Sequence, residues 1–175
     1  MPKGRLLTLG IVLGLLSLPL GLLWQQTLGG KTLLPADTLF EFQPWKAAAD
    51  SFAPGPHPQN HLLKDLILEN YAWKRFIVES LQRGQLPLWN PYTFAGEPFW
   101  ANGQHSALYP LSALFYVMPL WRAYGWFAVS QLWLAGVWMY MLCRVLGQRR
   151  ASAVMAAITY QLSAFFVVSL VFPMI

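Results

Sequence analysis

The sequence predicts an all-α, polytopic membrane helix bundle with about three spans and one long polar loop outside the membrane. Of the 175 residues, 56% are hydrophobic and only 11% are charged, whereas soluble domains carry roughly 25% charged residues. A chain so poor in charge lacks the polar groups to cover a globular surface in water. All 7 acidic residues lie between Asp37 and Glu97, and long apolar runs bracket that segment.

These features divide the chain into four parts. We expect an N-terminal membrane anchor (1–25), an extracytoplasmic loop (26–105), an interfacial or re-entrant helix (106–121) and a transmembrane helical hairpin (122–175). Because the chain stops directly after an apolar run, we also expect the natural protein to continue beyond Ile175.

The first apolar run, Leu6 to Trp24, is the predicted anchor. About 20 apolar residues cross a bilayer. Lys3 and Arg5 precede the run, and such residues collect on the cytoplasmic side, so the N-terminus is predicted to be cytoplasmic. The alternative is a cleaved signal peptide, whose apolar core is roughly 7–15 residues long and ends at small residues. This run is longer, and residues 24–28 make a poor cleavage site.

Two further spans are predicted over residues 124–146 and 151–172. The short turn between them carries Arg149 and Arg150, which places it in the cytoplasm and makes the spans an antiparallel hairpin. The stretch 106–121 is short for a span and contains Pro110 and Pro119. We interpret it as a re-entrant or interfacial helix on the outer face, and a short tilted span is the alternative. Residues 26–121 are then extracytoplasmic.

An amphipathic helix is predicted from about His61 to Arg83, after the Pro/Gly-rich linker 54–58. Asn60 is a suitable N-cap and Gly84 a natural stop. Its apolar residues recur at helical spacing and are Leu62, Leu63, Leu66, Ile67, Trp73, Phe76, Ile77 and Leu81.

Two carboxylates of like sign, Asp65 and Glu69, lie four positions apart on this helix. Such a pair is mildly destabilising on an exposed helix. Two converging carboxylates suit a general base or a divalent cation. A solvated helix face is the alternative interpretation.

The segment 85–104 is rich in aromatic, proline and amide residues and lacks regular periodicity. A disordered linker would not hold so many large apolar rings, so we expect a fixed loop. Tryptophan rings stack on sugar faces and amides bond sugar hydroxyls, which makes Trp89 and Trp100 candidates for sugar recognition. An aromatic belt at the membrane interface is the alternative.

The sequence gives little support for nucleic-acid binding, a disulfide or a histidine metal site. The net charge of +5 does not predict nucleic-acid binding, because the basic residues are scattered or sit at the ends of spans. A single cysteine, Cys143, cannot form an internal disulfide, and the histidines are too dispersed to be a ligand set.

Several strings of residues resemble the YfhO-like bacterial membrane proteins. They are Asp65, Tyr71-Ala72-Trp73-Lys74-Arg75, Gly84-Gln85-Leu86-Pro87-Leu88-Trp89-Asn90-Pro91, Gly96-Glu97-Pro98, Asn102-Gly103-Gln104 and Tyr109-Pro110. The resemblance implies a membrane glycosyltransferase of the GT-C type at the outer face of the bacterial cytoplasmic membrane. It would transfer a sugar from a polyprenyl-phosphate donor to a glycan or lipid acceptor.

The resemblance also implies roles for residues. Members use an essential acid in the first large outer loop, for which Asp65 is the first candidate and Asp37 the second. The chain departs from the family pattern at Glu69 and Asn70, which weakens any fixed role for Glu69. A divalent cation held by Asp65 and Glu69 is the alternative to a carboxylate that acts alone. Expected substrate-binding residues are Lys74, Arg75 and Arg122 for the phosphate, and Trp89, Asn90, Glu97, Asn102 and Gln104. The alternative function is a non-catalytic membrane component of cell-envelope assembly or transport.

Overall fold

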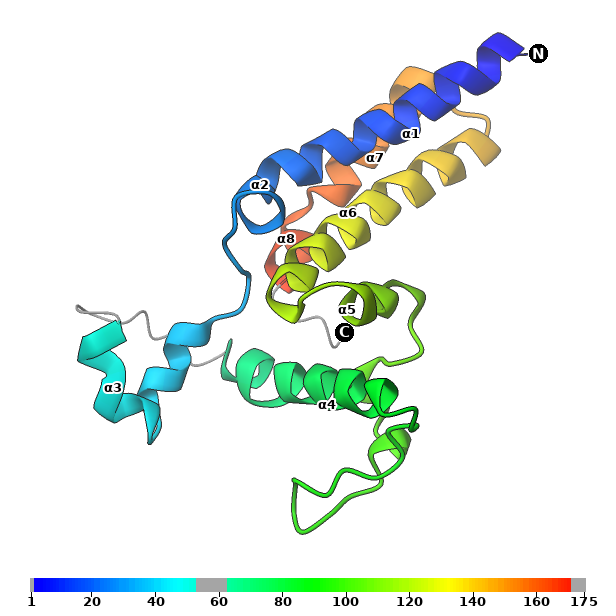
Figure 1. The fold of residues 1–175 in the computed structure, drawn as a ribbon. Helices are drawn as coiled ribbons and strands as arrows, with labels where there is room; N and C mark the ends of the chain where they lie inside the picture. The colour runs from blue at the N-terminus through cyan, green and yellow to red at the C-terminus, as the bar shows by residue number, and fades with distance from the viewer. Residues whose placement is uncertain (1, 53–62, 171–175) are drawn as a thin grey trace. The chain divides into compact units, whose positions relative to one another are not determined.

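Helices make up the regular structure of the computed structural model, which describes residues 2–52 and 63–170 (Figure 1). Within these ranges there is no strand, and an isolated β-bridge joins Asn90 to Glu97. Three helical segments are long and apolar enough to cross a membrane, namely Gly4–Leu22, Leu120–Val145 and Arg150–Ser169. The all-α fold class and the presence of three candidate spans are therefore confirmed.

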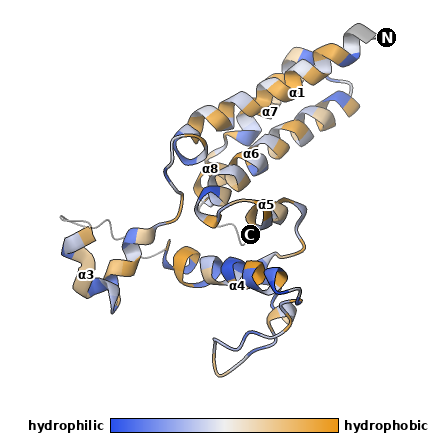
Figure 2. Cartoon of the chain, in the orientation of Figure 1, coloured by the Kyte–Doolittle hydropathy of each residue, from blue (hydrophilic) through white to orange (hydrophobic). Residues whose placement is uncertain are grey.

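The described residues form two compact units, 2–32 with 124–170, and 33–123. The first unit contains the long apolar helices α1 (Pro2–Leu22), α6 (Leu120–Val145, from Tyr124 onward) and α7 (Arg150–Gln161), with the short helices α2 (Trp24–Thr27) and α8 (Ala164–Ser169). Figure 2 shows hydrophobic residues along most of these helices.

The core of the first unit is a cluster of Leu15, Tyr140, Ala153 and Ala157. The Trp133 indole Nε1 donates to the Val12 carbonyl oxygen at 2.8 Å, which adds a polar tie between α6 and α1. Small residues such as the two alanines let helices approach closely, and interhelical hydrogen bonds reinforce membrane bundles.

A tight turn joins α6 to α7. Gly147 adopts a φ of 78°, and the Gln148 N–H donates to the Cys143 carbonyl oxygen at 3.0 Å. This is a Schellman-type helix end, in which glycine takes the left-handed position. The third span is not one continuous helix, because α7 ends at Gln161 and α8 begins at Ala164. Its predicted end, Phe172, lies outside the described residues.

The second unit begins with the 3-10 helix η1 (Ala36–Glu41) and α3 (Trp45–Phe52), a helix that the sequence analysis did not predict. The amphipathic helix follows and is helical over residues 63–82. It comprises a π-helical turn, η3 (Leu66–Asn70), and α4 (Tyr71–Gln82). Its predicted N-cap, Asn60, and the linker 54–58 lie outside the described residues.

The predicted stop of the amphipathic helix is confirmed. Gly84 has a φ of 71°, and the Gln85 N–H donates to the Ser80 carbonyl oxygen at 3.0 Å. Of the apolar face, Leu66, Ile67, Trp73 and Ile77 are buried, while Leu81 is exposed. Trp73 and Ile77 pack with Phe99, so α4 holds the aromatic segment that follows it.

The stretch 106–121 is not a single helix. It contains η6 (Pro110–Ser112) and α5 (Ala113–Val117), and α6 already starts at Leu120. Met118 is extended, with φ −137° and ψ 164°, because a residue before proline is driven out of the helical region. The expectation of one helix over 106–121 is thus corrected to two short helical pieces that together cover Pro110 to Val117 and end before Pro119.

Candidate functional site

The second unit contains a fully buried lysine. Lys74 is 0% exposed. Its Nζ donates to the His105 carbonyl oxygen at 2.7 Å, to Ser106 Oγ at 3.0 Å and to Ser112 Oγ at 3.4 Å. Nζ also lies 4.8 Å from the centre of the Phe115 ring. Among the described residues no carboxylate pairs with this amine, and burial lowers the pKa of Lys74 to about 8.

The place of Lys74 on its helix explains why the side chain is buried. Lys74 and the buried Asn70 fall within the apolar stripe formed by Leu66, Trp73 and Ile77 on the same helix. A helical residue on that stripe must face the protein interior whatever its charge. The three oxygen partners satisfy the amine there, as a buried polar group requires.

His105 belongs to the same cluster. The Ala107 N–H donates to its Nδ1 at 3.0 Å, and the imidazole stacks on Phe99 with 4.4 Å between ring centres. Its Nε2 is buried and has no hydrogen-bond partner in the described part of the chain. Burial is the main cause that lowers the pKa of His105, and the charge of Lys74 adds to the effect. The imidazole is therefore held neutral.

The segment after Gly84 is a fixed loop rather than a linker. The backbones of Asn90 and Glu97 bond each other twice, with both N–H to oxygen distances at 2.9 Å. The buried Asn90 side chain donates to Thr93 Oγ1 at 2.9 Å and to Glu97 Oε1 at 3.4 Å. Asn90 and Glu97 thus organise this turn from within.

The Trp89 ring packs directly against the backbone of Gly96. A Cβ at residue 96 would lie 2.6 Å from Trp89 Nε1, and the φ of 117° at Gly96 also disfavours any larger residue. Trp89 is 57% exposed and Trp100 is 37% exposed. Asn102 accepts from the Gln104 N–H at 3.1 Å, and the side chain of Gln104 faces solvent. The loop therefore presents rings and amides to the outside.

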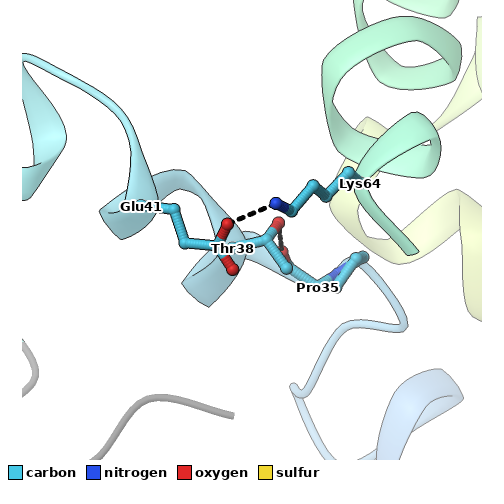
Figure 3. Close-up of polar contacts among 4 residues, drawn as sticks. All are labelled: Pro35, Thr38, Glu41 and Lys64. Atoms are coloured by element: carbon cyan, nitrogen blue, oxygen red, sulfur yellow. Dashed lines mark hydrogen bonds and ion pairs between the residues drawn. The ribbon is translucent and has the colours of Figure 1, made fainter. Parts of the chain in front are cut away.

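The two candidate acids lie on neighbouring segments. Asp65 and Glu69 are both exposed, at the start of and within the π turn, and Asp37 is half-buried in η1. Lys64 Nζ and Glu41 Oε2 form an ion pair of 2.5 Å (Figure 3). Thr38, beside Asp37, donates to the Pro35 carbonyl oxygen at 2.6 Å (Figure 3). The ion pair brings η1 and η3 into contact, and with them the acid-bearing segments.

The two arginines expected at the phosphate are exposed. Arg75 Nε bonds Glu79 Oε1 at 2.8 Å, and this bond is the main cause that raises the pKa of Arg75. The Arg122 guanidinium lies 5.1 Å from the centre of the Trp121 ring. Lys74, by contrast, donates its hydrogen bonds to oxygen atoms of the protein and is not exposed to solvent.

The described residues offer few side chains that could bind a metal ion. In residues 2–52 and 63–170, no group of three or more His, Cys, Asp or Glu side chains is arranged to hold a metal ion. Asp65 and Glu69 supply a pair of exposed carboxylates.

The sequence analysis missed Ser106, Ser112 and the role of His105. The signal that was present is the placement of Asn70 and Lys74, four apart, inside the apolar stripe of the amphipathic helix. A charged residue in such a place predicts a buried polar cluster, although its partners come from a distant segment. Comparison with protein-family models, with curated proteins and with solved structures returned no match, so no family is shown for this chain.

Proposed function

We propose that the chain belongs to a membrane glycosyltransferase of the GT-C type, which transfers a sugar from a polyprenyl-phosphate donor to an extracytoplasmic glycan or lipid acceptor. The observation that carries the proposal is the pairing of an exposed carboxylate, Asp65, with a π-helical turn at Leu66–Asn70. Single π turns within helices occur frequently at functional sites. The resemblance to YfhO-like proteins begins at the same residue.

The aromatic loop supports a sugar ligand. Trp89 and Trp100 present exposed rings, and Gln104 presents an exposed amide. Rings that are held in place lose little entropy when a ligand stacks on them. Gly96 supplies that restraint for Trp89. Three apolar segments able to span a membrane agree with a substrate confined to lipid.

In the proposed mechanism a carboxylate, Asp65 first and Asp37 second, accepts the proton of the acceptor hydroxyl as its oxygen attacks the anomeric carbon. The bond between that carbon and the phosphate oxygen of the lipid carrier breaks. Exposed Arg75 and Arg122 stabilise the charge on the departing lipid phosphate. The buried amine of Lys74 supports the loop instead of touching the phosphate.

Consumption of a lipid-linked sugar by membranes that contain the full-length protein tests this proposal. Asp65→Asn is expected to abolish transfer while membrane insertion and expression stay unchanged. Asp50→Asn, another exposed carboxylate of the second unit, is the matched control and should keep wild-type turnover. Asp37→Asn decides between the two candidate acids, and added chelator reports on a divalent cation.

Wild-type turnover in both Asp65→Asn and Asp37→Asn removes the carboxylate mechanism. Absence of any sugar consumption by the wild type, with retained binding of a polysaccharide that depends on Trp89 and Trp100, favours the alternative of a non-catalytic envelope component. The exposed rings are the observation that favours this second function.

A further inference from the structure

Ser106 has two features that set it apart from an ordinary loop serine. Its backbone lies in the left-handed region, with φ 47° and ψ 36°, which a residue with a side chain rarely adopts and which concentrates at functional sites. Its hydroxyl is half-buried, and in the described part of the chain the hydrogen-bond partner of Oγ is Lys74 Nζ, at 3.0 Å.

We propose that Ser106 and Lys74 form a serine–lysine dyad for acyl transfer, with Ser106 Oγ as nucleophile and Lys74 Nζ as general base, acting on carboxylic esters that carry an apolar acyl group. This activity is independent of the glycosyl transfer proposed above. A serine hydroxyl is a weak nucleophile until an adjacent base accepts its proton, and a desolvated lysine can serve as that base.

The surroundings hold the amine for this task. The His105 carbonyl oxygen and Ser112 Oγ accept from Nζ at 2.7 Å and 3.4 Å, which fixes Nζ beside Ser106. Ser112 Oγ in turn donates to the Ser106 carbonyl oxygen at 2.7 Å. Ser112 is therefore a positioning residue, which restrains both members of the dyad.

Burial makes the Lys74 amine easier to deprotonate than the amine of an exposed lysine. Burial lowers the pKa of Lys74 to about 8, so a usable fraction is unprotonated near neutral pH. The titratable groups packed nearby are His105, whose pKa is lowered, and Tyr116, whose pKa is raised by burial. Neither carries a charge near pH 8, and no carboxylate pairs with Lys74 in the described residues.

The reaction balances with these two groups. Ser106 Oγ attacks the ester carbonyl carbon, and its proton passes to neutral Lys74 Nζ. The bond between the carbonyl carbon and the alkoxy oxygen then breaks, and the alcohol leaves with the proton from Nζ. Water attacks the acyl-serine, Nζ accepts a proton from the water, and this proton returns to Ser106 Oγ as the carboxylic acid departs.

The flanks of Ser106 indicate the substrate class. Leu108 is 78% exposed and Tyr109 is 39% exposed, so apolar surface adjoins the nucleophile. Apolar acyl chains partition into lipid, to which three candidate spans would tether the chain. Esters with such a chain fit better than a hydrophilic peptide.

The test is covalent labelling of the whole chain in detergent or nanodiscs with an alkyl fluorophosphonate, followed by peptide mapping. Ser106 Oγ should displace fluoride and retain the phosphonyl group. Because the neutral fraction of an amine with a pKa of about 8 rises roughly 90-fold between pH 6 and pH 9, the labelling rate should rise by about the same factor.

Variants distinguish the dyad from a purely structural lysine. Ser106→Gly removes the hydroxyl and relieves the left-handed strain, so it should fold well and take no label. Lys74→Arg keeps a cation but no base, and should slow labelling at least 100-fold with helicity retained. Ser152→Ala, an exposed serine on α7, is the control and should label as the wild type does.

Absence of label on Ser106 in the folded wild type at pH 9 overturns the proposal. So does a labelling rate that stays flat between pH 6 and pH 9, or label that persists at another residue in Ser106→Gly at the wild-type rate.

Discussion

Gln161 lies against Gly136 so closely that a Cβ on residue 136 would approach the Gln161 side-chain oxygen to less than 3.0 Å. Gln161 is wholly buried, and its Nε2 donates to the Leu15 carbonyl oxygen at 3.3 Å. The amide thus links α7 to α1 at a point where α6 offers no side chain. The same register brings Tyr140 of α6 onto Ala153 and Ala157, so α6 and α7 run antiparallel.

Gly136→Ala should destabilise the first unit. The added methyl must displace a buried amide that is held by a hydrogen bond, and overpacking of this kind costs about 1–3 kcal/mol. Gly10→Ala is the control, because nothing lies within 4 Å of a Cβ at that position in α1. Both changes gain helix propensity. Thermal unfolding in detergent should show a lower midpoint for Gly136→Ala alone, and equal midpoints would contradict the contact.

The stability of the second unit should rise with pH above about 8. The folded-state pKa of Lys74 is lowered to about 8 from an ordinary value of 10.5. Between these two values the unfolded chain binds more protons than the folded chain, so the free energy of unfolding increases as the pH rises. The gain is on the order of a few kcal/mol. Denaturant unfolding at pH 7.5, 9 and 10.5 measures it.

Lys74→Met removes the titrating group and should flatten this pH dependence, with Lys46→Met, an exposed lysine on α3, as the matched control. A wild-type stability that falls over the same window would show that the folded state prefers the charged amine.

Gly96→Ala should loosen the aromatic loop. The substitution adds a Cβ within 2.6 Å of the Trp89 indole and forces a φ of 117° on a residue that disfavours it. Strain of this type costs about 1–3 kcal/mol. Gly103→Ala is the control, because it has open space and no positive φ. Hydrogen exchange of the Asn90 and Glu97 amides should quicken only in Gly96→Ala.

The ion pair between Lys64 and Glu41 should contribute modestly. The side chains are 24% and 20% exposed, so water screens the pair in part. A double-mutant cycle with Lys64→Met and Glu41→Gln is expected to give a coupling of about 0.5–1 kcal/mol at low salt. This coupling should shrink as salt is added, and a coupling near zero at low salt would remove the pair as a link between η1 and η3.

The sequence predicted those parts of the fold that depend on local pattern. Apolar runs marked the three candidate spans, and Gly84 marked a helix end that has a positive φ. The break of the third span at Leu162 and Ser163 carried no such signal. Neither did α3, whose short length leaves little periodicity to detect.

The sequence allows only part of the polar cluster around Lys74 to be predicted. The apolar stripe of α4 shows that Lys74 must be buried, but its partners Ser106 and Ser112 lie on a segment whose path depends on tertiary packing. Asn90 and Glu97, predicted to bind substrate, also bond each other within the loop, a contact that the sequence did not predict. Whether Asp65 or Asp37 performs chemistry stays a prediction.

The number of residues in the π turn at Leu66–Asn70 determines the direction in which Asp65, just before it, points relative to α4. Each residue of an α-helix advances the chain by about 100° around the axis. A π turn closes i→i+5, so it holds one residue more than an α-helical turn. If the same residues closed as ordinary α-helix, Asp65 and everything before it would rotate by about that angle relative to α4. The extra residue in the turn therefore sets the direction of the Asp65 carboxylate relative to the buried face of α4, and deleting it would shorten the turn while nearly keeping that direction.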